Sequence, residues 1–374
     1  MDFDLSDEQA LLKDSLERFV RNDYDFDSRR RNLASERGFS STHWQLFGEL
    51  GWTAMPFPEV DGGLDGGAIE LMLIMEQFGR GLVIEPYLPT IVLAGGALRR
   101  AGSEAQKSRW LAPLVAAEQT AALAFAEPGG RFDPWHVTTR AERDGEGWRL
   151  HGEKIAVLNA RDAGLVVVPA RTAGATGDRD GIGLFVVTAG TKGMRVTAYP
   201  TVDGLQAADL ALDGVRVDGE ALLGTPDGGG SVLAEVYDEA LLAVSAEAVG
   251  VMSVLLEKTI DYTRNRRQFG VPIGTFQALQ HRMVEMFMCV EQSRSLLYMA
   301  AMKLAAGHDD ASRALAALKY QVGTSGRLIG EEAVQLHGGM GVTDELDVAH
   351  YFKRVTTLDL LFGNADHHLT RYTG

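Results

Sequence analysis

The sequence contains a single cysteine, Cys289, in 374 residues. One cysteine excludes an intrachain disulfide and a metal site built from thiolates alone. Apolar residues never run uninterrupted for the roughly 18 positions that cross a membrane. The first six residues also lack the basic and then apolar pattern of a signal peptide. We therefore expect a cytoplasmic protein without a membrane segment.

Basic residues are scarce relative to acidic ones, with 36 Lys and Arg against 51 Asp and Glu and a net charge of −15. Nucleic acids and anionic membranes attract basic surfaces, so this balance argues against both as main partners. A local basic pocket for one phosphorylated ligand stays compatible with it. The length allows two or three folding units of roughly 100–200 residues each.

Three regions of different character follow one another along the chain, which predicts an α+β fold. Residues 1–118 show apolar positions at helical spacing, beginning behind the capping candidate Ser6. Residues 119–225 contain short β-prone runs separated by Gly and Asp, which predict a small antiparallel barrel or sandwich. Residues 226–374 are strongly helical, and the glycine-rich segment 227–230 before them resembles a hinge.

The C-terminal region is predicted to contain three long helices. They span about residues 233–264, 276–306 and 311–336, the last behind the capping candidates Asp309 and Asp310. Helices of this length with broad apolar faces usually pack against each other or against other subunits. We therefore expect an oligomer rather than a monomer.

Several short motifs together resemble the acyl-CoA dehydrogenase family. Residues 266–270 read Arg-Arg-Gln-Phe-Gly, residues 276–277 Phe-Gln, and residues 335–341 Gln-Leu-His-Gly-Gly-Met-Gly, similar to the flavin-binding signature of that family. Residues 127–129 and 152–159 resemble two motifs of its middle domain. The resemblance covers essentially the whole chain and implies the acyl-CoA dehydrogenase fold, with an N-terminal helical domain, a central small β-barrel or sandwich and a C-terminal four-helix bundle.

The resemblance also implies FAD as cofactor. A guanidinium is suited to the phosphate oxygens of FAD, and Arg266 takes that role by resemblance. Glycines without Cβ atoms let a cofactor approach the backbone closely. In this family these groups reach into the flavin of a neighbouring subunit. The alternative is that Arg266 and Arg267 are only a solvated pair of charges and that the glycines only end a helix. The implied cofactor residues are Arg266, Gln268, Phe269, Gln277, Gln335, Gly338 and Gly339.

The sequence departs from the family at the catalytic base. The family reaction needs a carboxylate to take the α proton of the thioester, usually a Glu in a Tyr-Glu-Gly-Thr segment. Phe362 falls on that position, and Ala240 occupies the position of the alternative family base. Glu247 lies seven residues after Ala240 on the same predicted helix, among apolar neighbours that would raise its pKa. It is either an unorthodox base or a buried Glu paired with an Arg from an adjacent helix.

The residues expected around this chain's own flavin ring are also changed. Ala126, Ala156 and Leu158 stand where the family has Thr, Trp and Thr, and Leu241 stands where an Arg often holds CoA. The groups that reach a neighbour's FAD are retained, while those that serve the chain's own flavin and thioester are lost. This split predicts the supporting subunit of an α2β2 heterotetramer.

Within the family the sequence looks most like the small subunit of pimeloyl-CoA dehydrogenase-type enzymes and like steroid side-chain heterotetrameric enzymes. The implied partners are an acyl-CoA thioester, a second acyl-CoA dehydrogenase subunit, and electron-transfer flavoprotein as electron acceptor. The alternatives are a self-sufficient homotetramer that uses Glu247 as base and a flavin-free assembly subunit. We expect no metal site, because His350, His367 and His368 lack carboxylates at ligand spacing.

Overall fold

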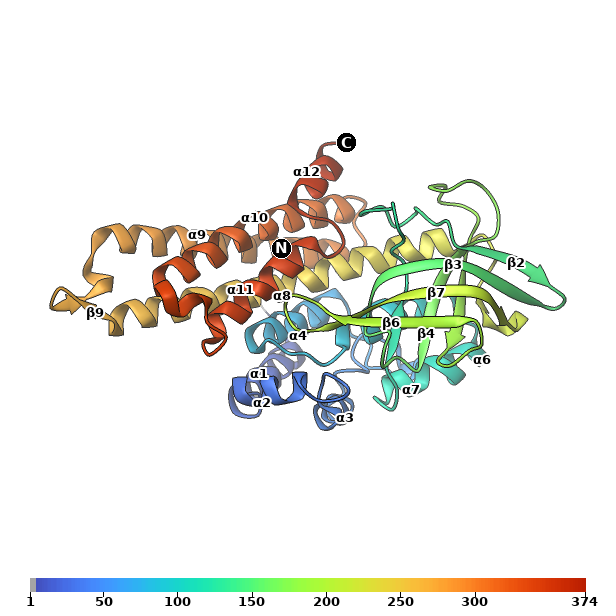
Figure 1. Ribbon diagram of the computed structural model, residues 1–374, viewed down its shortest axis with the longest axis horizontal. Coiled ribbons are helices and arrows are strands. Elements are labelled where there is room, and N and C mark those ends of the chain that lie inside the picture. Colours follow the sequence, from blue (N-terminus) through green and yellow to red (C-terminus); the bar gives the residue numbers. More distant parts are fainter. Residues whose placement is uncertain (1–4) are drawn as a thin grey trace. The chain divides into compact units, whose positions relative to one another are not determined.

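The computed structural model describes residues 5–374, which divide into two compact units. The first unit contains the chain through Arg31, residues 67–83 and residues 241–374. The second contains residues 32–66 and 84–240. Helices come first along the chain, strands follow and helices return (Figure 1), which confirms the predicted α+β class. N-terminal helices therefore share a unit with the C-terminal ones.

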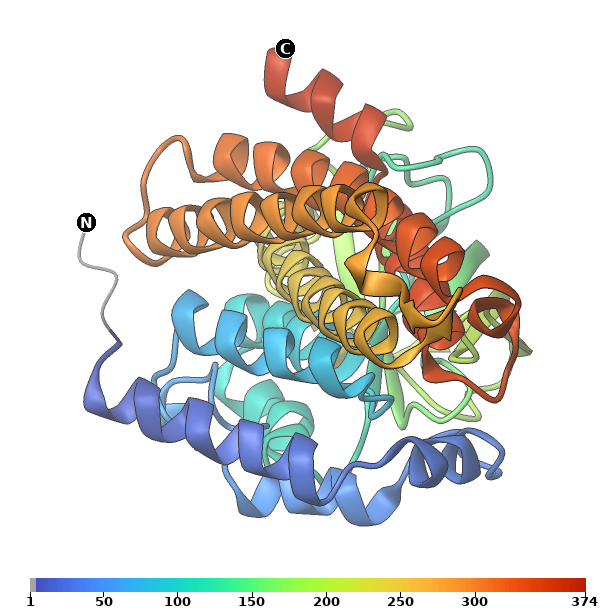
Figure 2. The ribbon, with the colours of Figure 1, turned by 90° about the vertical axis from the view of Figure 1, so that its left-hand side faces the viewer.

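The first unit is built from helices, and the three long helices predicted from the sequence are present. α8 begins at Gly229, four residues before the predicted start at Leu233. α9 and α10 lie side by side, and α11 and α12 both pack on α10 (Figure 2). The helices that contribute to this unit are α1 (Asp7–Asn22), α2 (Phe26–Leu33), α4 (Ala68–Gly81), α8 (Gly229–Asn265), α9 (Gln277–Ala305), α10 (Ala311–His337), α11 (Asp347–Leu360) and α12 (Ala365–Thr373).

Helix capping follows the sequence at α1 but not fully at α10. The Gln9 backbone N–H donates to Ser6 Oγ at 3.2 Å, and the Ser6 N–H donates to Gln9 Oε1 at 3.0 Å, which forms a capping box. Asp310 occupies the N-cap position of α10, but its carboxylate pairs with Lys303 instead of capping the helix. The position was therefore predicted correctly and the interaction was not.

Two glycines let α4 and α8 cross with their backbones in contact. A Cβ atom added to Gly79 would lie 2.0 Å from the carbonyl oxygen of Glu247, and one added to Gly250 would lie 2.0 Å from that of Glu76. Both distances are too short for any side chain, so only glycine fits these positions. The crossing places Glu76 and Glu247 at the helix–helix contact.

Replacing Gly79 with alanine is therefore expected to destabilise the protein. The added methyl group forces α4 away from α8, and overpacking of this kind costs about 1–3 kcal/mol of the free energy of unfolding. Urea denaturation checks the prediction. Gly67→Ala is the control, because a Cβ there would meet only the end of the Glu70 side chain at 3.8 Å. Equal stabilities of the two variants would contradict this account of the crossing.

The second unit combines short helices with a mixed β-sheet. Neighbouring strands follow the order β6-β7-β3-β2-β4-β5-β8, and β1 pairs with β4. Most pairs are antiparallel, but β1 and β2 run parallel to β4, so the prediction of a purely antiparallel domain was wrong in these two places. The main elements are α3 (Ser41–Glu49), the π-helix η2 (Leu88–Gly95), α5 (Gly96–Ala101), α6 (Glu104–Gln106), the π-helix η3 (Lys107–Leu111), α7 (Ala112–Val115), β1 (Ala121–Leu123), β2 (Arg140–Asp144), β3 (Gly147–Leu158), β4 (Leu165–Arg171), β5 (Ile182–Thr188), β6 (Met194–Pro200), β7 (Gln206–Val217) and β8 (Leu222–Leu223).

The glycine-rich segment predicted as a hinge is instead tightly packed. A Cβ on Gly230 would lie 1.9 Å from the Arg179 carbonyl oxygen, and one on Gly229 would lie 2.6 Å from that of Ile182. Gly228 also forms a β-bridge with Ile182. These glycines allow the close approach of two chain segments. The sequence alone did not distinguish that use of glycine from flexibility.

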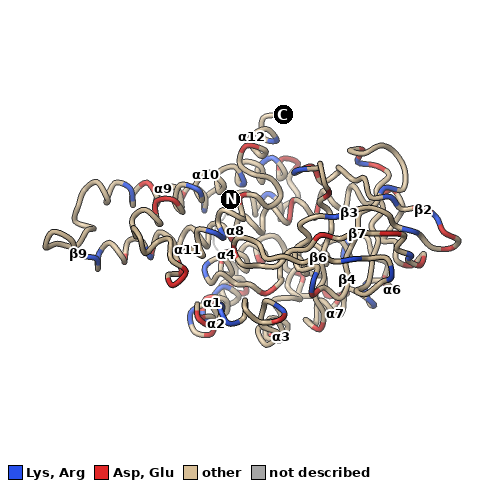
Figure 3. Tube along the Cα trace, viewed as in Figure 1, with Lys and Arg blue, Asp and Glu red and all other residues tan. Residues whose placement is uncertain are grey.

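Helix α8 is apolar enough, by length and composition, to cross a membrane. Its most apolar window has a mean hydropathy of 1.8, but 94% of that window is buried inside the fold. Burial accounts for the apolar composition as in the core helix of a globular protein. Figure 3 shows basic and acidic residues interspersed along the described chain, so the net charge of −15 arises from many dispersed side chains.

Candidate functional site

The segments of the flavin signature all lie in the first unit. α8 ends at Asn265, and the hairpin of β9 (Arg267–Gln268) and β10 (Val271–Pro272) then leads into α9. Figure 1 shows β9 at one end of the long helices. Tyr262 on α8 packs its ring against His337 at the end of α10, with the ring centroids 4.3 Å apart. This contact joins the hairpin to the glycine turn that follows α10.

All of the predicted cofactor residues are exposed. Phe269 is 92% exposed, with its backbone in the left-handed region at φ 52°, although a phenylalanine normally buries its ring. Arg266 makes no ion pair with any residue in the described range 5–374. A group outside this chain is therefore free to contact the whole set: Arg266, Gln268, Phe269, Gln277, Gln335, Gly338 and Gly339.

The glycine turn leaves its backbone open to approach. Gly338 has φ 63°, which favours glycine, and an added Cβ on Gly338 or Gly339 would meet no atom within 4 Å. An exposed guanidinium, exposed amides and an open glycine backbone are groups that fit the diphosphate and adenosine of FAD. The residues present thus fit a flavin cofactor held at the surface of the first unit.

The loop at the position of the family base is filled by an apolar side chain. Phe362, between α11 and α12, is 6% exposed with φ 59°, and its carbonyl oxygen lies 2.8 Å from Nε2 of the buried His368. Lys319 on α10 donates from Nζ to the carbonyl oxygens of Asp359 at 2.7 Å and Gly363 at 2.8 Å. Buried polar contacts therefore hold this loop, and Phe362 contributes no acid to it.

Sequence reasoning missed Lys319, which is fully buried. Burial lowers its pKa to about 8, although the nearby Asp359 opposes this shift. The signal was present: Lys319 is a single charge among the apolar residues from Ala314 to Val322 on a helix that is predicted to be buried. A lysine buried in this way either forms an ion pair or donates hydrogen bonds to carbonyl oxygens. Here the carbonyl oxygens of Asp359 and Gly363 accept the hydrogen bonds of the Lys319 ammonium.

The lowered pKa of Lys319 predicts a specific pH dependence of stability. The pKa is about 8 in the folded chain and about 10.5 in the unfolded chain, so between these values the unfolded state binds more protons. Stability should therefore rise with pH across that window, by at most about 1.4 kcal/mol per pH unit from this group. Urea denaturation of the wild type and of Lys319→Met isolates the contribution. An identical pH slope in both proteins would contradict it.

Glu247 is buried and fully paired. Glu247 is 2% exposed. Arg354 on α11 donates from Nε to Oε1 at 2.5 Å and from Nη2 to Oε2 at 2.8 Å. Both carboxylate oxygens therefore already accept charge-assisted hydrogen bonds from one guanidinium. The geometry supports the interpretation of Glu247 as one half of a structural ion pair. Its role as base stays a prediction.

In the second unit, three family-motif positions have no polar side chain. Ala156 has φ 51° and donates its backbone N–H to Asp209 Oδ1 at 3.0 Å, while Ala126 accepts from the Ile155 N–H at 2.9 Å. Neither alanine side chain, nor that of Leu158, has a polar atom. These three positions therefore offer no side-chain hydrogen bond to a ligand.

Two further motif residues of the second unit form a buried ion pair. Lys154 Nζ lies 2.6 Å from Glu127 Oε1, and both side chains are fully buried. Burial alone would raise the pKa of Glu127, but Lys154 and the hydrogen bonds from Thr138 and Thr139 outweigh burial and lower it. Burial lowers the pKa of Lys154 to about 8. The pair anchors the loop after Glu127 to strand β3.

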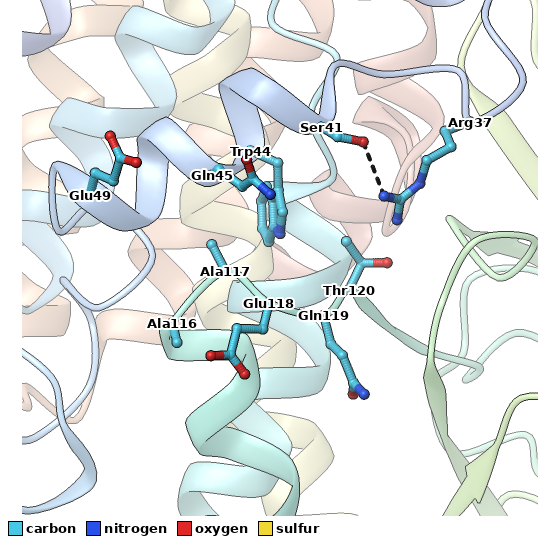
Figure 4. Close-up of a pocket in the computed structure, with 10 residues that line it drawn as sticks. All are labelled: Arg37, Ser41, Trp44, Gln45, Glu49, Ala116, Ala117, Glu118, Gln119 and Thr120. Atoms are coloured by element: carbon cyan, nitrogen blue, oxygen red, sulfur yellow. Dashed lines mark hydrogen bonds between the residues drawn. The ribbon is translucent and has the colours of Figure 1, made fainter.

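A small hollow of about 260 Å³ also lies in the second unit, between α3 and residues 116–120 (Figure 4). Arg37 donates to Ser41 Oγ at 3.1 Å on one side of Trp44, and Glu118 and Gln119 extend from the opposite segment. None of the residues predicted for the cofactor or the base lines this hollow. It is therefore separate from the flavin signature.

The histidines considered as metal ligands have other contacts. His350 Nε2 lies 3.2 Å from the carbonyl oxygen of Asp344, and the rings of His367 and His368 pack edge to face. Among residues 5–374, no group of three or more His, Cys, Asp and Glu side chains lies close enough to hold a metal ion. These histidines therefore act as packing and hydrogen-bonding residues.

Comparison with known proteins decides the family. Three family models match in order: the acyl-CoA dehydrogenase N-terminal domain over residues 6–118, the middle domain over 122–215 and the C-terminal domain over 227–372. The chain belongs to the acyl-CoA dehydrogenase family. Members of this family are FAD-dependent oxidoreductases that act on the CH–CH bond of acyl-CoA thioesters, so the predicted family, enzyme class and cofactor are confirmed at this level.

Relatives match this acyl-CoA dehydrogenase along nearly its whole length. The probable acyl-CoA dehydrogenase YngJ of Bacillus subtilis is 28% identical over 98% of this chain and 97% of its own. In the ChsE4–ChsE5 complex from Mycobacterium tuberculosis, a chain 28% identical superposes with a TM-score of 0.90 over 100% of this chain and 98% of that one. PigA, solved with FAD and proline, gives a TM-score of 0.92 at 27% identity, over 100% and 98%.

Proposed function

We propose that this chain is the supporting subunit of an α2β2 acyl-CoA dehydrogenase, in which its exposed signature completes the FAD site of a catalytic partner. The observation that carries the proposal is a contrast within one chain. The residues that reach toward a neighbour's FAD are present, exposed and unobstructed. The residues that would serve a flavin and thioester of its own are apolar or already paired.

The reaction divides between the two subunits accordingly. Bound FAD supplies the hydride acceptor for the β hydrogen of an acyl-CoA thioester. In this chain, Arg266 would hold the diphosphate, Phe269 would pack at the adenine, and Gly338 and Gly339 would let the cofactor approach the backbone. Because Phe362 cannot accept the α proton, the partner supplies the carboxylate.

Exposed apolar residues around the signature support coverage by another subunit. Phe269, Val271, Phe276, Met340 and Val342 are all exposed in this part of the first unit. Contiguous exposed apolar residues of this kind mark protein–protein contacts. Two of the similar solved structures are complexes of two acyl-CoA dehydrogenase chains, ChsE4–ChsE5 and the steroid enzyme Tcur3481–Tcur3483.

The remaining partners follow from the family. The substrate is an acyl-CoA thioester, and electron-transfer flavoprotein takes the electrons; one similar solved structure comes from work on the electron-transferring flavoprotein of Acidaminococcus fermentans. The relatives in Bacillus subtilis and Desulfococcus multivorans favour a cytoplasmic location. A homotetramer that uses Glu247 as base is the weaker candidate, because Arg354 already binds both oxygens of that carboxylate.

Co-expression with a second acyl-CoA dehydrogenase subunit tests the proposal. Acyl-CoA oxidation is measured with an artificial electron acceptor for this chain alone, the partner alone and the complex. We expect turnover in the complex and none from this chain alone. Full turnover from this chain alone would overturn the proposal.

A further inference from the structure

The hollow of about 260 Å³ between α3 and residues 116–120 has a buried hydrogen-bond donor without an acceptor in its wall. Trp44 on α3 lines the hollow and is 3% exposed. Among residues 5–374, no acceptor lies within hydrogen-bond distance of its indole Nε1. A buried tryptophan N–H usually finds a partner, because a buried donor left unpaired costs free energy. The unpaired donor therefore borders a space that a ligand can enter.

The contacts of α3 hold the Trp44 ring in place. Its backbone N–H donates to the Ser40 carbonyl oxygen at 3.0 Å, and the Ser40 side chain caps the helix by accepting from the His43 N–H at 3.1 Å. The ring packs against Phe47, with the ring centroids 6.4 Å apart. Figure 4 shows the ring extending from α3 toward residues 116–120. The indole therefore keeps this position without a ligand.

The opposite wall of the hollow is a turn with a constrained backbone. Ala117 has φ 55°, in the left-handed region that a residue with a Cβ rarely adopts. It packs closely against α3, because a Cβ added to Gly48 would lie 2.8 Å from the Cβ of Ala117. The Glu118 N–H donates to the Pro113 carbonyl oxygen at 2.9 Å. Both walls are thus formed by contacts within the chain, as in most small-molecule sites.

Arg37 provides a cation at one end of the hollow. It lines the hollow and forms no ion pair with any residue in the range 5–374. Its guanidinium lies 4.7 Å from the centroid of the Phe39 ring, and Nη1 donates to Ser41 Oγ at 3.1 Å. Burial raises the pKa of Asp162 although the charges of Arg161 and Arg37 oppose it, so Arg37 is near this carboxyl without binding it. Its Nε and Nη2 can therefore donate to a ligand.

The acidic side chains of the hollow lie away from Arg37. Glu49 and Glu118 also line it, but Figure 4 shows both carboxylates on the far side of Trp44 from Arg37. The end of the hollow at Arg37 thus attracts an anionic group, whereas the other end repels one. A ligand with a single negative charge fits this distribution.

We propose that this hollow binds a small monocarboxylate, whose oxygens accept hydrogen bonds from Trp44 Nε1 and from the guanidinium of Arg37. A carboxylate supplies the acceptor that the indole lacks, and it forms charge-assisted bonds with a guanidinium. The volume is below the roughly 300–1,000 Å³ of sites for drug-sized ligands, so the ligand has only a few carbon atoms. The inference does not depend on the subunit role proposed above.

Isothermal titration calorimetry of the full chain, in the assembly in which it purifies, tests this proposal. The probes are acetate, propionate and lactate, with propionamide and propylamine as a neutral and a cationic molecule of similar size. We expect at least one carboxylate to bind at least tenfold more tightly than both propionamide and propylamine, because neither offers a negative charge to Arg37. If either binds equally well, or if no carboxylate binds up to about 10 mM, the proposal is overturned.

Variants assign the carboxylate to this hollow. Trp44→Phe keeps an aromatic ring but removes the N–H, and it should weaken the tightest carboxylate about tenfold. Trp135→Phe is the matched control, because Trp135 Nε1 also lacks an acceptor among the described residues but Trp135 does not line the hollow. Arg37→Gln should weaken binding at least tenfold, whereas Arg195→Gln, at an exposed arginine of β6, should not. Unchanged affinity in Trp44→Phe or Arg37→Gln, with the variant folded by circular dichroism, would overturn the proposal.

Discussion

Replacing Arg354 with methionine is expected to lower the free energy of unfolding by about 3–5 kcal/mol, because Glu247 is then left as an unpaired buried charge. Both residues are nearly inaccessible, and both carboxylate oxygens accept from the guanidinium. Helix α11, which carries Arg354, is also fixed to α4, because the Tyr351 hydroxyl donates to the Arg80 carbonyl oxygen. Urea denaturation of the single variant measures the loss.

The double variant Glu247→Leu with Arg354→Met is the matched control. Replacing both charges with apolar groups of similar size removes the unpaired charge, so most of the lost stability should return. A double variant as unstable as Arg354→Met would show that the pair is not the cause. Glu247→Gln in the assembled enzyme separates structure from catalysis. We expect unchanged turnover; loss of turnover in a folded, FAD-loaded complex would make Glu247 the base.

Replacing Arg266 with glutamine is expected to weaken FAD binding by the complex about a hundredfold. A bidentate guanidinium–phosphate contact involves charge-assisted hydrogen bonds worth about 1.5–3 kcal/mol each, and glutamine cannot replace its charge. Stability should not change, because Arg266 is exposed and makes no ion pair among the described residues. Flavin absorbance after dialysis and calorimetric titration with FAD measure the effect.

The neighbouring Arg267→Gln is the control for this prediction. It changes the same charge in the same hairpin, but the resemblance assigns no phosphate contact to Arg267. FAD affinity should stay within about threefold of the wild type, which corresponds to less than 1 kcal/mol. Equal losses in both variants would indicate a general electrostatic effect. An unchanged affinity in Arg266→Gln would remove Arg266 from the FAD site.

Local patterns in the sequence predicted the helices well and the sheet less well. Apolar spacing fixes a long helix within a few residues, as for α9 and α10. The parallel pairing of β1 and β2 with β4 depends on long connections that no local pattern reveals. The glycines at 228–230 show the same limit, because a close contact with a distant strand and a hinge require the same residue type.

The candidate site was also predictable only in part. Resemblance supplied the signature residues, and the missing base at Phe362 was visible in the sequence. Pairing between distant residues was not: nothing near Glu247 in the sequence indicates that Arg354, on another helix, binds it.

Native mass spectrometry of the complex purified with its partner tests the central claim most directly, because it reports the subunits and the bound flavin together. The account predicts two copies of each chain, one FAD for each partner subunit and no FAD on this chain when it is purified alone. A homotetramer of this chain that carries one tightly bound FAD per subunit would contradict it.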